Sequence, residues 1–138
     1  MVFFMKKLVS LFVVFFLIVG VLMVPISAVE PRWSNTSLVI MQHGYLNGSA
    51  ECIIEIDGYS GARISNVDIR LDKVVGTTFV NVASWNDLSS GQYFEFLETV
   101  PNVDLYCTYR LSFTADVYRN GTVEQLDMHK DVYYTPQN

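Results

Sequence analysis

The segment LYCTYRLSFTADV, residues 105–117, separates apolar from polar side chains by parity. Its odd positions, from Leu105 through Cys107 to Val117, are apolar, and most of its even positions are polar. Successive side chains of a β-strand point to opposite faces, so an alternation of period two is typical of a strand with one buried face. We therefore predict a long strand here, with Cys107 on its buried face.

Six further β-rich runs follow residue 35, and turn-forming residues separate all of them. The turns are marked by Asn47-Gly48, Gly58 through Gly61, Gly76, Ser89-Ser90-Gly91, Pro101-Asn102 and Asn120-Gly121. The predicted strands cover residues 36–42, 49–57, 64–75, 77–85, 92–99, 105–118 and 122–134. Strands of this number and length suit two antiparallel sheets packed face to face, so we predict an all-β, seven-stranded antiparallel sandwich.

The last hairpin can be assigned a register. Asn120-Gly121 is a preferred two-residue turn because both positions accept positive φ. The predicted inward pairs are Ala115 with Leu126, Phe113 with Met128 and Tyr109 with Val132, and the predicted outward pair is Arg110 with Asp131. The same register places Lys130 inward opposite Leu111, which requires either a place at the sheet margin or a bulge.

The first 28 residues differ from the rest of the chain. Lys6 and Lys7 precede an uncharged apolar run from Leu8 to about Ile26, and small residues end at Ala28. This is the pattern of an export signal, which we expect to form a signal helix and to be cleaved after Ala28. An uncleaved membrane anchor is the alternative, because about 20 apolar residues span a bilayer. The expected organisation is a signal peptide over 1–28, an N-terminal extension over 29–35 and a sandwich domain over 36–138.

Two cysteines fall on inward faces of predicted strands. Cys52 shares its face with Ile54 and Ile56, and Cys107 belongs to the segment described above. The second and sixth strands of a seven-stranded sandwich lie in opposite sheets. In an exported protein two such cysteines form a disulfide most simply, so we predict a Cys52–Cys107 bond. Two free buried cysteines acting as small hydrophobes are the alternative.

The charge of the chain argues against nucleic acid as a partner. Without Lys6 and Lys7, seven basic residues remain against fourteen acidic ones, a net charge of −7. A chain this acidic does not bind nucleic acid or anionic lipid by charge. We expect contact with a membrane only through the leader, if the leader is retained.

Motifs for catalysis or metal binding are not evident. His43 and His129 are the two histidines, and His129 lies on an outward face beside Asp127 and Asp131. A carboxylate-oriented general base is conceivable there, but a solvated surface histidine is the favoured interpretation. Acidic side chains on the second and third strands also favour a solvated face over a calcium site. We expect no catalytic residues, no metal and no cofactor.

Aromatic side chains suggest an interaction surface. In the predicted register Tyr106, Tyr118 and Tyr133 point outward from the last hairpin, together with Arg110. Exposed aromatic rings bind sugars and partner proteins, so a cell-surface glycan or protein is the candidate partner. Aromatic residues are also ordinary sheet formers on exposed faces, and this is the favoured interpretation.

Two resemblances follow from these residues. Cys52 and Cys107 on facing inner strands resemble the immunoglobulin-like sandwich, whereas Trp85, 33 positions beyond Cys52, and Leu105 at the tyrosine-corner position depart from true immunoglobulin domains. An Ig-like or fibronectin-type sandwich is therefore expected. The segments PRWSNTS (31–37), AECIIEIDGYSGARI (50–64), ASWND with SSG (83–91) and CTYRLSFTADVYRNGTVE (107–124) resemble a family of small secreted proteins of unknown function from Gram-positive, Clostridia-type bacteria. That resemblance implies export by a bacterium and supplies no catalytic residues.

The sequence thus leads us to expect an exported, non-catalytic sandwich used for recognition or structure at the cell surface or outside the cell. A small secreted hydrolase that uses His129 with a neighbouring carboxylate is one alternative. The other is a membrane-tethered accessory subunit, held by the leader on the outer face of the cytoplasmic membrane.

Overall fold

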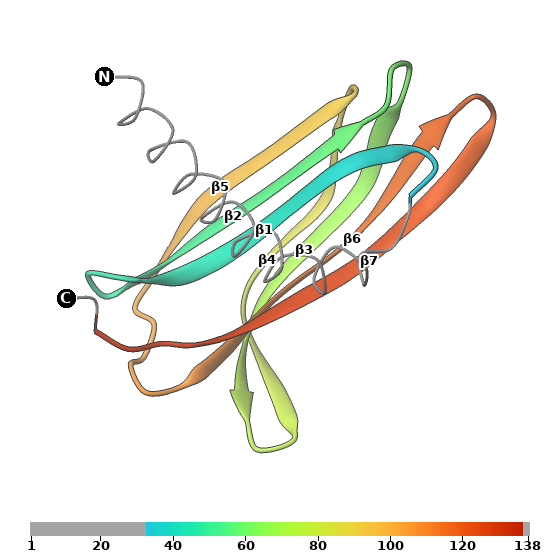
Figure 1. Ribbon diagram of the computed structural model, residues 1–138. Coiled ribbons are helices and arrows are strands. Elements are labelled where there is room, and N and C mark those ends of the chain that lie inside the picture. The colour runs from blue at the N-terminus through green and yellow to red at the C-terminus, as the bar shows by residue number, and fades with distance from the viewer. Residues whose placement is uncertain (1–32, 137–138) are drawn as a thin grey trace, which may run out of the picture. The chain divides into compact units, whose positions relative to one another are not determined.

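The computed structural model describes residues 33–136, which form seven antiparallel strands in two sheets (Figure 1). The strands are β1 (Thr36–Leu46), β2 (Ser49–Gly58), β3 (Arg63–Val75), β4 (Thr78–Ser90), β5 (Tyr93–Pro101), β6 (Thr108–Arg119) and β7 (Thr122–Tyr133). The predicted all-β class and the number of strands are confirmed. The expected signal peptide, its cleavage position at Ala28 and residues 29–32 lie outside the described residues.

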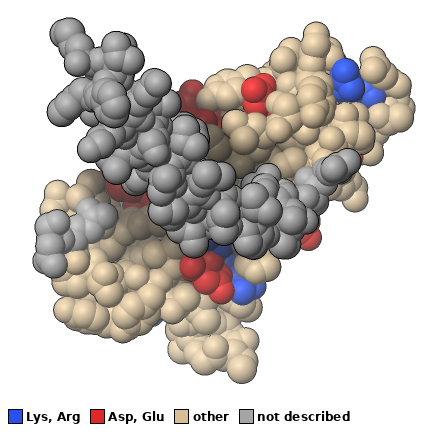
Figure 2. Space-filling view, viewed as in Figure 1, with Lys and Arg blue, Asp and Glu red and all other residues tan. Residues whose placement is uncertain are grey.

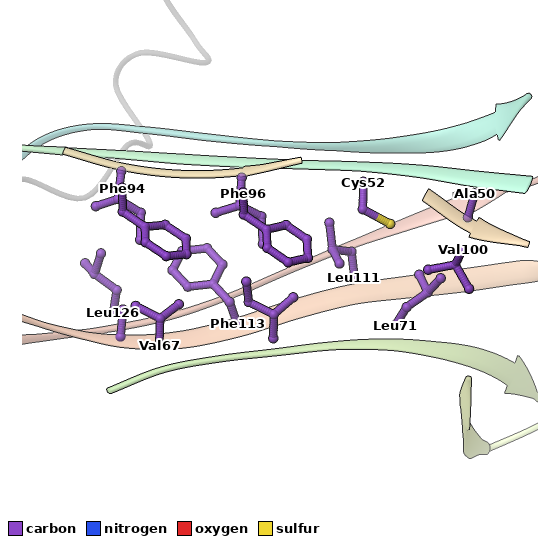
Figure 3. Close-up of a cluster of buried hydrophobic side chains, with 14 of the residues drawn as sticks. Ala50, Cys52, Val67, Leu71, Phe94, Phe96, Val100, Leu111, Phe113 and Leu126 are labelled. Atoms are coloured by element: carbon purple, nitrogen blue, oxygen red, sulfur yellow. The ribbon is translucent and has the colours of Figure 1, made fainter. Parts of the chain in front are cut away.

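The two sheets have the strand orders β1-β2-β5 and β4-β3-β6-β7. Their facing sides bury an apolar layer, in which Phe94 and Phe96 of β5 point toward Val67 and Phe113 of the opposite sheet (Figure 3). The alternation of the sequence explains this layer directly. In β2 every second residue from Ala50 to Gly58 is buried, and the odd positions of β6 from Tyr109 to Val117 are buried in the same way.

The last turn and the last register are as the sequence predicts, whereas the predicted turn at Ser89-Ser90-Gly91 comes later, because β4 continues to Ser90. Asn120 and Gly121 both have positive φ, 52° and 76°, which a two-residue hairpin turn of this kind needs. All the predicted pairs of β6 with β7 are present, including Arg110 opposite Asp131 and Leu111 opposite Lys130. Lys130 is exposed and its strand is at the edge of the sheet, so the margin rather than a bulge accommodates its charge.

Residues before β1 belong to the packed unit. Trp33 packs against the core, and Asn35 is buried with its side-chain amide donating to the Val117 carbonyl at 2.9 Å. The Ser34 amide donates to a Glu124 carboxylate oxygen at 2.6 Å. The compact unit therefore starts at Trp33. Because it contains all seven strands and their common core, we expect residues 29–138 to fold on their own.

The two cysteines are free, which corrects the predicted disulfide. The sequence pattern predicts a strand that begins at residue 105 and includes Cys107. In the structure Tyr106 has a φ of 59°, and β6 begins only at Thr108. Tyr134 rather than Cys107 reaches the core beside Cys52, because its hydroxyl bonds His43, the cross-strand partner of Cys52. Burial raises the pKa of the Cys52 thiol to about 12, so this side chain acts as a small, unreactive hydrophobe.

The free thiols give a direct prediction. Titration of the denatured, unreduced protein should count two reactive thiols per chain. The Cys107→Ser variant should change the free energy of unfolding by less than about 1 kcal/mol, since loss of a native disulfide typically costs about 2–5 kcal/mol. A count of zero thiols, with a loss in the disulfide range, would contradict the structure.

Candidate functional site

The outer face of the sheet β4-β3-β6-β7 carries a row of charged side chains and a polar pocket. It consists of the even positions of β6 from Thr108 to Tyr118, the odd positions of β7 from Val123 to Tyr133, and their neighbours in β3 and β4. These side chains point away from the core because their sequence neighbours point into it. On the one side of the molecule that Figure 2 shows, charged groups lie in small separate clusters on a largely uncharged surface.

A charged row crosses this face near the start of β6. The register aligns Asn81, Asp72, Arg110 and Asp131 across the four strands. Arg110 donates through Nε and Nη2 to the two carboxylate oxygens of Asp131, at 2.7 and 2.9 Å, and its guanidinium lies 4.6 Å from the centre of the Phe79 ring. The hydrogen bond from Arg110 lowers the pKa of Asp131. This bidentate, ring-covered pair fixes both side chains.

Asp72 is buried on this face although it points away from the core. Only 5% of the residue is exposed. Its Oδ1 atom accepts hydrogen bonds from Arg70 at 3.1 Å and from the Asn81 amide at 3.0 Å. The side chains of the charged row therefore form hydrogen bonds with one another, and these bonds make this part of the face rigid.

A concave pocket lies farther along the same face, where the pairing of β3 with β6 is interrupted between Ser65 and Asp68. Asn66 adopts a positive φ of 52° there, and its amide donates to Asp116 at 2.8 Å. The backbone amide of Asp87 donates to Asp68 at 2.9 Å. The pocket has a volume of about 300 Å³ and is lined by Asn66, Asp68, Thr114, Ala115, Asp116, Gln125, Leu126 and Asp127.

The side chains that line the pocket can form hydrogen bonds, and none of them is a lysine or an arginine. Three carboxylates, two amides and one hydroxyl line it, together with Ala115 and Leu126, whose side chains are buried in the core. A ligand with several hydroxyl or amino groups would find acceptors and donors there. Sequence patterns alone do not reveal this pocket, because a bulge brings Asn66 and Asp68 to the β6–β7 hairpin.

The aromatic residues predicted to form one surface are not brought together. Tyr133 lies opposite Thr108 and Tyr118 lies opposite Val123, ten positions apart along β6. At about 3.3 Å per residue this separates them by roughly 33 Å. Tyr106 lies outside β6. Tyr118 is the one of the three on the side of the pocket, two positions from Asp116 on the same face, and the Arg63 guanidinium lies 5.2 Å from its ring centre.

His129 is exposed on the outer face and lies directly across from Ser112. In residues 33–136 no hydrogen bond joins these two side chains, and neither lines the pocket. The acidic residues of the second and third predicted strands also lie apart, because β2 and β3 belong to different sheets. Within the described part of the chain, no group of three or more His, Cys, Asp or Glu side chains could hold a metal ion.

A buried polar cluster at the inner edge of β1 escapes the sequence prediction. His43 is nearly inaccessible, with Nδ1 at 2.7 Å from the Tyr134 hydroxyl and Nε2 at 2.7 Å from the Lys130 carbonyl oxygen. The Tyr134 ring stacks on Tyr109 with centres 4.4 Å apart. The predicted first strand ends at residue 42, whereas β1 continues to Leu46. The odd positions of this strand point inward. A predicted strand extended by one more residue would therefore have placed His43 in the core.

The hydrogen bonds of this cluster define the tautomer of His43. A carbonyl oxygen only accepts, so Nε2 carries the proton that bonds Lys130, and Nδ1 accepts from the Tyr134 hydroxyl. Burial lowers the pKa of His43. The neutral imidazole is thus the form that links β1 of one sheet to β7 of the other.

Comparisons with known proteins yield little. No family model and no curated protein matches the chain. A crystal structure of Spo0M, a sporulation control protein from Bacillus subtilis, matches with a TM-score of 0.43 and 12% sequence identity over 76% of this chain. The chain spans about half, 51%, of that structure. Among residues 33–136 there is no helix with the length and apolar character needed to cross a membrane.

His43 makes the stability of the fold depend on pH. Its pKa is lower in the folded state than the usual 6.5, so the unfolded state binds the proton first as the pH falls. The contribution of neutral His43 to the free energy of unfolding should be fully present above pH 6.5. Below pH 6.5 the free energy of unfolding should decrease, by up to about 1.4 kcal/mol per pH unit, until the pH passes the folded-state pKa of His43. Lys130 and Asp131 are the neighbouring charges, and they oppose each other in this effect.

Urea unfolding between pH 5 and pH 8 measures this dependence. The His43→Gln variant should be less stable at pH 8 and should show a flatter profile between pH 6.5 and pH 5. The matched control is His129→Gln on the exposed face, which should keep the wild-type profile. A wild-type profile that is flat in this range would contradict the role of His43.

Proposed function

We propose that this chain is an exported, non-catalytic β-sandwich that recognises a glycan at the cell surface or outside the cell. Export is supported by the leader pattern of residues 1–28, and the N-terminal residue of the mature protein, measured by mass spectrometry, tests it. A fold does not imply a function, so the recognition role rests on the site. The observation that carries it is the polar pocket beside Tyr118.

The strand order supports an Ig-like sandwich of the fibronectin type. In constant-type immunoglobulin domains the fourth strand lies beside the fifth. Here β4 instead pairs with β3, which leaves three strands in one sheet and four in the other. Immunoglobulin domains have a buried core tryptophan on their third strand. In the described residues β3 has no tryptophan, and Trp85 lies on β4, where it packs against Phe96 with ring centres 4.8 Å apart. Domains of this architecture are used widely at cell surfaces.

The chemistry of the pocket supports a sugar ligand. Carboxylates and amides make bidentate hydrogen bonds with vicinal hydroxyl groups, and Asp68, Asp116 and Asp127 would also accept from an amino group. Tyr118 lies at the pocket side of the sheet with Arg63 over its ring, and adds an aromatic side chain that the apolar face of a sugar can contact. The lining contains no lysine or arginine, which disfavours phosphate and other anions.

Binding of cell-wall and host glycans to residues 29–138 tests the proposal. Backbone amide signals of Thr114, Ala115, Gln125 and Asp127 should shift on titration with the ligand. Asp127→Asn and Gln125→Ala should each weaken binding by about tenfold, since a hydrogen bond to a charged or polar partner in such a site is worth about 1–2 kcal/mol.

The matched control is Tyr133→Ala, which removes an exposed tyrosine of the same face at the far end of β7. It should leave the affinity unchanged. Failure to bind any glycan at millimolar concentration would contradict the proposal. An equal loss of affinity in the Tyr133 variant would move the site away from the pocket.

A further inference from the structure

The four edge strands of the two sheets are protected to different degrees. The edges are β1 and β5 in one sheet and β4 and β7 in the other. An edge strand presents unpaired backbone N–H and C=O groups, and monomeric proteins protect such edges with charge, proline, bulges or covering segments. Comparing the four edges therefore indicates where another strand can pair.

The edge formed by β1 and β7 is closed. His43 joins β1 to the Lys130 carbonyl of β7 at 2.7 Å, and Glu124 of β7 accepts from the amides of Ser34 and Asn35 at 2.6 and 3.2 Å. The exposed side of β7 also carries Asp127 and other charges. Addition of a strand along this side would break contacts that the fold already makes.

On the opposite side, β5 is protected and β4 is not. β5 carries Glu95 and Glu98 and ends in Pro101, which are typical edge protections. In residues 33–136 no hydrogen bond joins β4 to β5. The rings of Trp85 and Phe96 contact each other between these strands, with centres 4.8 Å apart.

The exposed segment of β4 is uncharged and includes exposed apolar side chains. Residues 76–86, GTTFVNVASWN, contain no charged residue and no proline. Phe79, Val80 and Val82 are 46%, 52% and 38% exposed. The β3–β4 hairpin extends beyond the other strands, so no part of the described chain covers its tip (Figure 1).

We propose that β4 pairs antiparallel with β4 of a second copy, around a two-fold axis near Val80. Two four-stranded sheets then become one continuous sheet of eight strands, and the exposed valines pack against their counterparts. An antiparallel pair of identical strands is self-complementary, which is the requirement of a closed two-fold dimer.

Charge allows a second copy to approach at this edge and disfavours its approach elsewhere. The whole chain has a net charge of −5, so two copies repel each other over most surfaces. Residues 76–86 form a neutral edge where two acidic copies approach without opposing like charges. The side formed by β1 and β7 is not neutral, and neither is β5, because β7 and β5 both carry carboxylates.

Analytical ultracentrifugation of residues 29–138, from micromolar to millimolar concentration, tests the dimer. The wild-type protein should form a concentration-dependent dimer. Val80→Lys places a charge at the proposed axis, twice in each dimer, and should weaken dimerisation at least tenfold. The matched control is Val123→Lys, which changes an equally exposed valine on β7 and should dimerise as the wild type does.

Hydrogen exchange gives an independent measure. Amides of β4 between Thr78 and Val82 should exchange more slowly at high protein concentration, and the amides of β5 should not change. A wild-type protein that stays monomeric at millimolar concentration would overturn the proposal. So would a dimer that Val80→Lys and Val123→Lys weaken equally. Glycan binding by the Val80→Lys monomer should be retained, so this test is separate from that of the pocket.

Discussion

The whole structure depends on the burial of one side of every strand between the two sheets. The central strand β2 contributes Cys52, Ile54 and Ile56, and the facing strand β6 contributes Leu111 and Phe113, all almost fully inaccessible. A slip of one residue in any strand would turn its apolar set to solvent. This constraint fixes the register, and the register in turn fixes which polar side chains meet on the outer faces.

The outer face shows how this works. Arg110 meets Asp131 because their neighbours point inward: Tyr109 is buried and Val132 packs against the core. The same register places Asp72 beside Arg110, where neighbouring side chains satisfy a carboxylate that solvent hardly reaches. The pocket arises where the register changes, because the bulge in β3 turns Asn66 and Asp68 toward β6 and β7. Regular pairing thus makes the rigid part of the face, and its interruption makes the concave part.

These relations also explain what the sequence could and could not predict. Strict alternation and an Asn-Gly turn were sufficient for the pairs of β6 with β7. The disulfide was predicted wrongly because the alternation of the sequence continues through Cys107, whereas the strand does not, owing to the positive φ of Tyr106. The pocket depends on a bulge, and the burial of His43 depends on which strands lie side by side. The alternation of apolar and polar residues within one strand reveals neither.

The attachment of the chain before β1 has a mechanical consequence. The backbone amides of Ser34 and Asn35 are held by Glu124, near the turn between β6 and β7, rather than by the neighbouring strand of their own sheet. Tension applied at Trp33 is therefore carried first by the opposite sheet. If the leader tethers the molecule to a cell, these two contacts would resist the drag of flow before any strand begins to peel.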